Sequence, residues 1–241
     1  MKAKNENSQI IVGIVLSCLG LFVGYGMPFF VGGMMTELGF SQTEANYVSS
    51  VEFAGMTIAS LLGIFWITKL DWRKVAVFAL LAIAIGNLVS AFTPSFLVLA
   101  VVRFFTALLG HGTAYALGAA ILGATSNPDR SFGLSGSVQY VMGSLVALLI
   151  PQAMTTFGMA GYCIPAMIVA ILALLLNTRL QTVKKSIAED NKISSTLPFL
   201  FLPIACLLVF VIFQIGHGPR WDNFVPFGAT IGLDAGDVGI A

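Results

Sequence analysis

The chain is organised as long apolar stretches separated by short polar ones. A membrane-spanning helix needs about 20 mostly apolar residues, and the sequence contains seven stretches of this kind, the sixth being short. None of them shows the alternating segments of about 10 residues that membrane β-strands carry. We therefore predict an all-α integral membrane protein, a bundle of seven transmembrane helices over residues 10–35, 46–68, 75–92, 95–124, 132–155, 162–176 and 197–216.

The composition supports a membrane protein. Of the 241 residues, 57% are hydrophobic and 10% are charged, whereas a soluble domain carries about 25% charged residues. The 12 basic and 11 acidic residues give a net charge of +1, which excludes electrostatic binding to nucleic acid. The three cysteines have a spacing typical of neither metal sites nor disulfides. Because no nucleotide motif or catalytic triad occurs either, we expect no metal, no cofactor and no enzymatic activity.

The basic residues predict the orientation. If the chain weaves back and forth, ten of the twelve lie on one side, with Arg220 on the other and Arg103 inside the fourth stretch. Cytoplasmic loops carry an excess of Lys and Arg, so the amino terminus should be cytoplasmic. We expect an integral plasma-membrane protein, in a bacterial inner membrane. The ten residues are Lys2, Lys4, Lys69, Arg73, Lys74, Arg130, Arg179, Lys184, Lys185 and Lys192.

The pattern restarts after the longest hydrophilic stretch, residues 177–196, which we interpret as a central cytoplasmic linker. The first and the seventh apolar stretch are each followed by an apolar-Gly-apolar triplet, an N-cap residue and an acid three positions later. These are Ser41 with Glu44, and Asp234 with Asp237, and each predicts a helix start at the outer surface. The second copy would begin an eighth helix near Ala241, so we expect the chain to be a fragment, unless the last residues form a polar tail.

Six spans, a linker and a restarted second set resemble the major facilitator superfamily of secondary transporters. Its fourth-helix motif, R-F-x-x-G-x-G-x-G, is similar to Arg103-Phe104-Phe105-Thr106-Ala107-Leu108-Leu109-Gly110-His111-Gly112, with Ala107 at the first glycine and the later glycines displaced by one. The signature after the second helix, G-x-x-x-D-R-x-G-R-R/K, is partly matched. The basic pair of that signature is present, but its acid is displaced and its second glycine is absent. The corresponding residues of the cytoplasmic loop are Lys69, Asp71, Arg73 and Lys74.

The resemblance implies twelve spans in two pseudo-symmetric halves, with a solute site between them near the bilayer midplane. Residues 1–176 would form the first half, 177–196 the linker and 197–241 the start of the second half. A full-length protein would be monomeric and move a small solute by alternating access. By resemblance the cytoplasmic loop would latch the two halves, although a solvated turn explains the same residues.

Glu52 and Arg103 are the only acid and base well inside predicted spans. An ionised group at mid-bilayer costs about 2.5–3.5 kcal/mol, so each should face a partner or water. At 1.5 Å per residue, the two lie about 10 and 12 Å below the outer ends of their helices. The matching depths predict a Glu52–Arg103 pair, either as a gated or protonatable coupling site or as a fixed salt bridge.

Further candidates for the solute pathway each have a packing alternative. His111, about 80° around the helix from Arg103, would take up a proton or simply pack. Tyr25 would face the cavity if the first helix bends. Ser135 and Gln139 share a helix face and would bond a polar substrate or a neighbouring helix. The glycines and the proline that would allow close packing or bending are Gly20, Gly24, Gly26, Pro28, Gly110 and Gly112.

Transport is therefore the leading hypothesis, coupled to protons through Glu52 and His111, with the solute unspecified. One alternative is a truncated protein that does not transport. A seven-helix receptor is the other, but such receptors normally place the amino terminus outside, and the seventh stretch has no lysine for a retinal linkage.

Overall fold

The computed structural model describes residues 2–177, 208–209, 212 and 215–240, and these contain helices and no strand. In chain order the elements are α1 (Lys2–Thr36), α2 (Gln42–Trp66), α3 (Trp72–Ala91), α4 (Phe96–Phe105), η1 (Thr106–His111), α5 (Gly112–Gly123), α6 (Pro128–Phe157), α7 (Ala160–Asn177), α10 (Phe224–Thr230) and α11 (Ala235–Ile240). The helices α4 and α5 and the π-helical η1 between them form one continuous rod, Phe96–Gly123. The predictions of the first six apolar stretches as helices are therefore confirmed.

Five of these rods are long and apolar enough to cross a membrane. The apolar part of α7, Ala160–Leu175, is shorter, as the sequence indicates. Most of the predicted seventh span and the linker after Asn177 lie outside the described residues. In the residues that it describes, the structure thus contains six helical rods followed by shorter helices.

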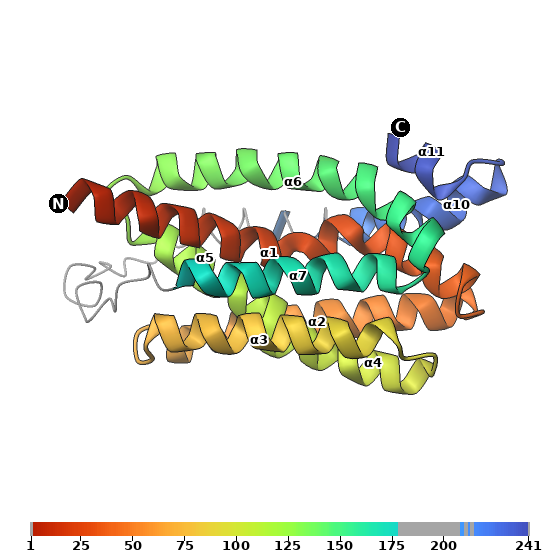
Figure 1. Cartoon of the computed structure of the whole chain (residues 1–241), viewed down its shortest axis with the longest axis horizontal. Coiled ribbons are helices and arrows are strands. Elements are labelled where there is room, and N and C mark those ends of the chain that lie inside the picture. Colours follow the sequence, from red (N-terminus) through yellow and green to blue (C-terminus); the bar gives the residue numbers. More distant parts are fainter. Residues whose placement is uncertain (1, 178–207, 210–211, 213–214, 241) are drawn as a thin grey trace.

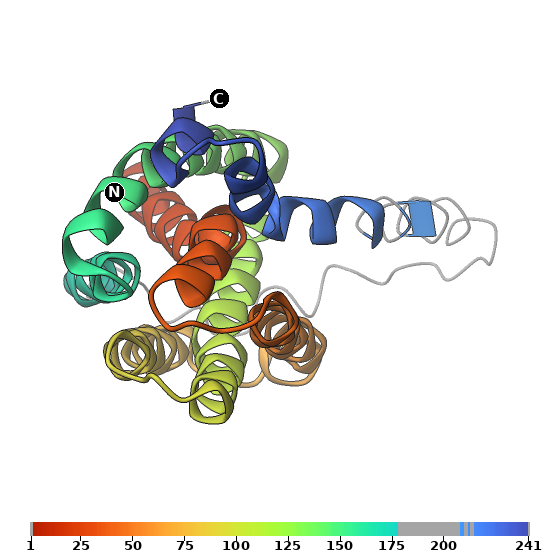
Figure 2. The same cartoon turned by 90° about the vertical axis from the view of Figure 1, so that its right-hand side faces the viewer.

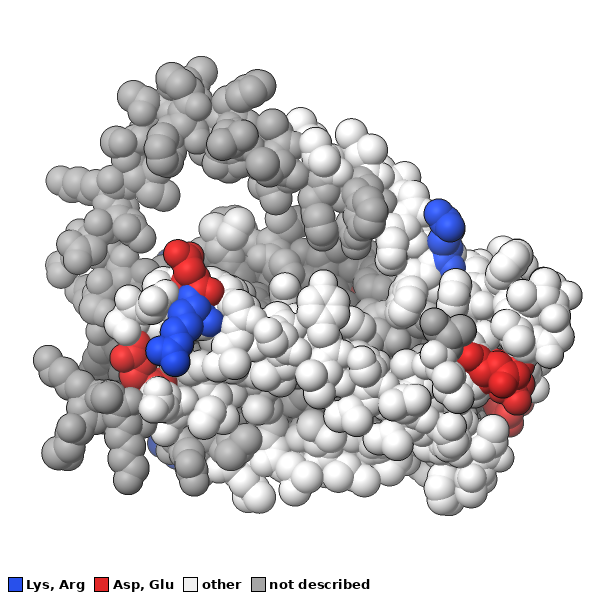
Figure 3. Space-filling view, turned by 90° about the horizontal axis from the view of Figure 1, so that it is seen from above, with Lys and Arg blue, Asp and Glu red and all other residues white. Residues whose placement is uncertain are grey.

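The rods run alternately up and down (Figure 1). The amino terminus, the α2–α3 turn and the α5–α6 connection share one end, which we call the amino-terminal end. The α1–α2 and α3–α4 connections lie at the opposite end together with α10 and α11, and we call this the far end. Lys69, Lys74 and Arg130 therefore share the amino-terminal end, as the back-and-forth weave predicts. On the face seen in Figure 3, the described charged side chains gather towards the two ends. Which end is cytoplasmic stays a prediction.

The two predicted helix starts are both present. Ser41 Oγ accepts a hydrogen bond from the Glu44 backbone N–H at 3.3 Å, and Glu44 Oε2 accepts one from the Ser41 N–H at 2.8 Å, so α2 begins with a capping box. At α11, Asp234 Oδ1 accepts from the Asp237 N–H at 2.8 Å and Asp237 Oδ2 accepts from the Asp234 N–H at 3.1 Å. The local sequence therefore sets where these helices begin.

The core consists of two apolar clusters, one towards each end. Along α1, residues 12–19 belong to the cluster at the amino-terminal end and residues 22–34 to the one at the far end. Viewed along the helices, α1 lies centrally and α6 at the periphery (Figure 2), in agreement with buried fractions of 67% and 17% in their apolar windows. Between the clusters, Asn87, Arg103 and His111 are buried polar residues. This interruption of the core marks the site.

Candidate functional site

The centre of the site is an ion pair between α2 and α4. Arg103 Nε donates a hydrogen bond to Glu52 Oε2 at 2.9 Å, and Arg103 Nη2 donates to Glu52 Oε1. Both side chains are completely buried. A bidentate guanidinium–carboxylate pair fixes direction as well as charge. The pair predicted from equal depth in the membrane therefore forms.

Two other helices complete the surroundings of the guanidinium. Arg103 Nη1 donates to Asn87 Oδ1 on α3 at 3.0 Å, and the Arg103 Cζ lies 4.8 Å from the centre of the Phe30 ring on α1, which is within the range of a cation–π contact. Asn87 is itself held by a 2.9 Å hydrogen bond from its Nδ2 to the Ile83 carbonyl. One guanidinium thus joins the first four rods.

His111 lies beside this group and uses both ring nitrogens. Its Nδ1 is 2.8 Å from the Leu19 carbonyl oxygen, and its Nε2 is 3.4 Å from Asn87 Nδ2. A carbonyl requires a donor and the amide nitrogen requires an acceptor, so the geometry fits a neutral ring protonated at Nδ1. A proton added at Nε2 would face the N–H donors of Asn87. In this arrangement His111 serves as a neutral link between α1, α3 and η1.

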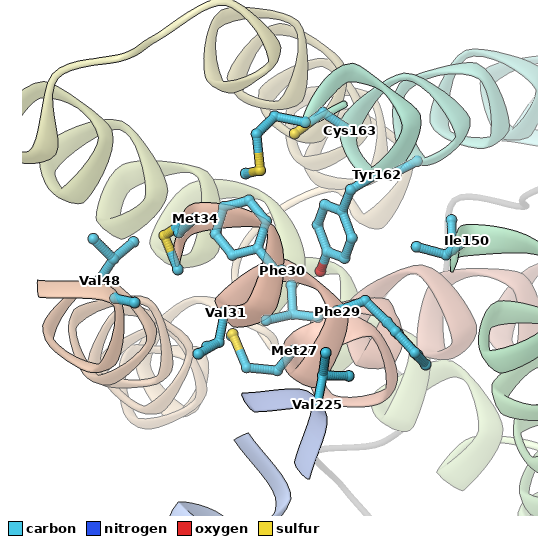
Figure 4. Close-up of a cluster of buried hydrophobic side chains, with 14 of the residues drawn as sticks. Met27, Phe29, Phe30, Val31, Met34, Val48, Ile150, Tyr162, Cys163 and Val225 are labelled. Carbon is cyan, nitrogen blue, oxygen red and sulfur yellow. The ribbon is translucent and has the colours of Figure 1, made fainter. Parts of the chain in front are cut away.

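Three aromatic rings pack together on the far-end side of the site. Tyr162 is fully buried, and its ring centre lies 4.7 Å from that of Phe30 and 5.3 Å from that of Phe22. Figure 4 shows the Tyr162 hydroxyl pointing towards α1. This oxygen has no hydrogen-bond partner among the described residues. A buried hydroxyl without a partner is costly. The Tyr162 hydroxyl is therefore a polar group at the edge of the network that can still form a hydrogen bond.

The other pathway candidates lie apart from this network. A Cβ at Gly143 of α6 would be 2.7 Å from the Tyr25 ring, so Tyr25 packs on α6. Ser135 and Gln139 bond each other, with 2.8 Å between Gln139 Nε2 and Ser135 Oγ. This intrahelical bond is neither of the two contacts that the sequence suggested for them. Within the described residues, no group of His, Cys, Asp and Glu could hold a metal ion.

The comparison with family models assigns the chain to a protein family. The model of the Major Facilitator Superfamily matches residues 10–241. The chain belongs to the major facilitator superfamily. None of the curated proteins matches it by sequence.

Solved transporters share its fold. A peptide transporter POT in complex with sulfate is 21% identical with a TM-score of 0.55, covering 93% of this chain and 50% of the other. A POT family transporter in complex with a thioalcohol-conjugated peptide is 19% identical with a TM-score of 0.54, covering 92% and 49%. A structure with 5-aminolevulinic acid bound gives the same values. The chain spans about half the length of these transporters. The family and the fold are those of membrane transporters.

The fourth-helix motif of this superfamily member contains the π-helix. Residues Thr106–His111 form η1, between the arginine of the motif and its last glycine. Hydrogen bonds from i to i+5 place more residues in each turn than in an α-helix, which accommodates glycines displaced by one position. The 80° rotation expected between Arg103 and His111 assumes a regular α-helix, and η1 changes it so that both side chains contact Asn87.

The small residues of this rod pack against neighbouring helices. A Cβ at Gly110 would lie 2.7 Å from Ile83 of α3, and one at Gly112 would lie 2.6 Å from Ala59 of α2. These two glycines therefore allow close packing, one of the two roles that the sequence suggested for them. On α1, a Cβ at Gly20 would lie 2.5 Å from Tyr115, and one at Gly26 would lie 2.6 Å from Tyr162.

Pro28 has a specific consequence for α1. Proline has no N–H, so the carbonyl four residues earlier, that of Gly24, has no helical partner. The Trp221 indole N–H donates to this carbonyl at 2.7 Å. No atom of a neighbouring helix lies within 4 Å of the position of a Cβ at Gly24, so Gly24 does not make the close helix approach expected of it.

The loop between α2 and α3, which is predicted to be cytoplasmic, is built as a helix start. Asp71 caps α3 by accepting a hydrogen bond from the Arg73 N–H at 2.9 Å, which explains an acid at this place. The Lys69 and Lys74 side chains are exposed, as expected of a solvated turn. The latch between halves that the resemblance implies stays a prediction.

Sequence reasoning missed Asn87, Tyr162 and Asp222. A signal existed for Asn87, because it is the one amide in the middle of an otherwise apolar helix. Tyr162 lies in an apolar run, where nothing distinguishes it from a packing residue. Asp222 follows the seventh stretch and reads as a surface acid, yet it is only 8% exposed.

Proposed function

We propose that the protein is a secondary active transporter that moves a small solute by alternating access and couples this movement to protons. The observation that carries the proposal is the buried Glu52–Arg103 pair, held by Asn87 in the interior of the bundle. Ionisable residues within membrane helices are costly, and they mark ion pathways and proton relays. Glu52 is the acid of this network, and its carboxylate is the group that we assign to coupling.

Alternating access requires two bodies that separate at one end. At the far end, three residues following the seventh stretch bond α1 and α2, which belong to the first half. Trp221 donates to the Gly24 carbonyl, Ser49 Oγ donates to Asp222 Oδ2 at 2.7 Å, and Gln42 Nε2 donates to Asn223 Oδ1 at 2.9 Å. We call these three hydrogen bonds the far-end contact. Next to these hydrogen bonds, Val225 of α10 packs against Gly32 of α1, so the contact that would open and close combines a few polar bonds with apolar packing.

The proposal includes the expected organisation of the chain. Residues 1–176 form the first half, 177–196 the linker, and residues from 197 belong to the second half. The protein lies in the plasma membrane of a bacterium with its amino terminus in the cytoplasm, and it functions as a monomer. The basic residues at the amino-terminal end support this orientation.

The test is solute-driven proton movement with the natural gene product in proteoliposomes. Solutes are presented in turn, beginning with short peptides because the structures of similar fold include peptide transporters. A pH-sensitive dye inside the vesicles reports proton entry. We expect one class of solute to move protons and to accumulate when a proton gradient is imposed. A protein that moves no solute would fit the alternative of a non-transporting membrane protein.

Two variants test the role of Glu52. Glu52→Gln should abolish proton-driven accumulation, and Glu37→Gln, at the exposed residue that follows α1, should not. Because Glu52→Gln leaves Arg103 unpaired, we add the double variant Glu52→Gln/Arg103→Gln, which removes both charges. The double variant should exchange solute across the membrane without using the proton gradient. Accumulation at the normal level by either variant would contradict the role given to Glu52.

A further inference from the structure

The far-end contact contains a carboxyl group in an unusual environment. The Asp222 side chain is 8% exposed, and its Oδ2 accepts the hydrogen bond from Ser49. Its second oxygen, Oδ1, has no hydrogen-bond partner among the described residues. A buried carboxylate normally needs a cation or several donors, whereas Asp222 has a single neutral hydroxyl.

A second unpaired acceptor lies nearby on α2. Asn46 Oδ1 is buried and has no hydrogen-bond partner in the described part of the chain. Asn46 precedes Ser49 by three residues, so the two share a face of the helix. The helix turn that bonds Asp222 through Ser49 therefore also carries an acceptor without a donor. One proton on the Asp222 carboxyl would remove the buried negative charge and turn an acceptor oxygen into a donor.

The charged groups around Asp222 also favour its protonated form. Glu52 on α2 and Tyr162 on α7 both interact electrostatically with it, and Glu52 is already paired with Arg103. The negative charge of Glu52 would disfavour the ionised form of Asp222, and the pairing of Glu52 with Arg103 reduces that repulsion. On its own segment, residues 215–222, the other titratable groups are His217 and Arg220, which are exposed. Burial raises the pKa of the Asp222 carboxyl above its ordinary value, although the Ser49 hydrogen bond acts in the opposite direction.

We propose that Asp222 is a proton-binding residue of the transporter, and that the far-end contact forms when Asp222 is protonated and separates when it is ionised. This inference rests on the proposed function, because it assigns a second group to the coupling proton. Its place differs from that of Glu52: Asp222 lies between the two halves, where a proton from the far side of the membrane meets the contact.

The direction of the pH dependence follows from linkage. A group with a higher pKa in the closed contact than in water binds its proton more tightly when the contact is closed. Closure is therefore favoured at low pH and lost as the pH rises through the raised pKa. Between the open-state and closed-state pKa values, one linked proton changes the closing equilibrium by up to tenfold per pH unit.

The experiment measures the contact directly, without transport. Spin labels are attached to Thr43→Cys at the start of α2 and Phe227→Cys in α10, both exposed positions next to the contact. The native cysteines are replaced by alanine at Cys18, Cys163 and Cys206. Pulsed electron paramagnetic resonance then gives the distance between labels in the natural gene product in nanodiscs from pH 4 to pH 9. We expect a short distance at low pH that converts to a longer one, with a midpoint above about 4, the value for a free Asp side chain.

Three variants decide whether Asp222 is responsible. Asp222→Asn mimics the protonated form and should keep the short distance at every pH. Asp129→Asn, a carboxylate at the start of α6, should respond like the parent. His217→Gln should also respond like the parent, which separates the carboxyl from the nearby imidazole. If Asp222→Asn fails to fold, the parent titration and His217→Gln still test the proposal.

The outcomes separate this inference from the proposed function. A distance that does not change with pH in the parent, or a pH response retained in Asp222→Asn, would overturn the role of Asp222. Proton-coupled solute movement found together with either result would leave the proposed function standing. A pH-dependent contact in a protein that moves no solute would contradict transport and leave Asp222 as a proton-binding residue.

Discussion

Removing one partner of the buried pair should destabilise the protein unequally. Glu52→Gln leaves the Arg103 guanidinium without a negative partner, and arginine does not lose its proton in proteins. Arg103→Gln leaves a carboxylate, which can take up a proton and become neutral. Breaking a buried pair costs about 3–5 kcal/mol. We expect Glu52→Gln to lower the free energy of unfolding by about that amount and Arg103→Gln to lower it by less.

The surroundings of Arg103 place the loss towards the lower part of this range. Asn87 still accepts a hydrogen bond from Nη1 at 3.0 Å, and the Phe30 ring still lies 4.8 Å from Cζ. Both partners are neutral, so they satisfy donors without balancing the charge. The double variant Glu52→Gln/Arg103→Gln has no charge left at the position of the pair, and we expect it to be more stable than Glu52→Gln alone.

Unfolding by sodium dodecyl sulfate in mixed micelles, followed by circular dichroism, gives the free energies of unfolding of the parent, the two single variants and the double variant. Glu37→Gln serves as the control on an exposed carboxylate and should change the free energy by less than about 0.5 kcal/mol. The reasoning would be refuted by a double variant whose loss equals the sum of the two single losses, because independent residues behave additively.

Two further predictions concern the π-helix and its neighbour. Deleting Leu109 from η1 should leave a regular helix and a protein that is monodisperse in gel filtration. Deleting Leu81 from the regular helix α3 should instead rotate all later residues of that helix and cause the protein to aggregate. Equal behaviour of the two deletion variants would contradict the assignment of η1. Gly86→Ala places a Cβ against the Thr106 side chain of η1 and should lower the free energy of unfolding by about 1–3 kcal/mol, measured by the same unfolding in sodium dodecyl sulfate. The control Gly133→Ala lies in open space on α6 and should leave the free energy of unfolding unchanged or raise it.

The features that the sequence predicted correctly depend on local patterns or on the membrane itself. The capping boxes at Ser41 and Asp234 follow from residues three positions apart, which interact whatever the rest of the fold does. The Glu52–Arg103 pair follows because charges in a bilayer need partners, and helix geometry gives each charge a depth. Depth together with a partner requirement is enough to match two residues 51 positions apart.

The features that were missed depend on rotation and on tertiary contacts. The contact of His111 with Asn87 requires the π-helix, and no local signal distinguishes Thr106–His111 from an α-helix. The burial of Asp222 depends on its contact with Ser49, 173 residues away. Its position after an apolar stretch gives no indication of that partner. Such contacts between segments far apart in the chain are set by packing, which a single sequence does not reveal.

The two carboxyl groups assigned to proton binding are connected through one face of α2. Ser49, which bonds Asp222, and Glu52, which bonds Arg103, are three residues apart and both buried. The next turn carries Gly55, where a Cβ would lie 2.6 Å from the Phe104 carbonyl oxygen of α4. Contact this close, together with the bidentate pair, holds α2 against α4 as one body. Opening at the far end must then occur between residues 221–223 and the helices α1 and α2, where three hydrogen bonds have to break. A proton leaving Asp222 would favour this opening by placing an unbalanced negative charge inside the contact.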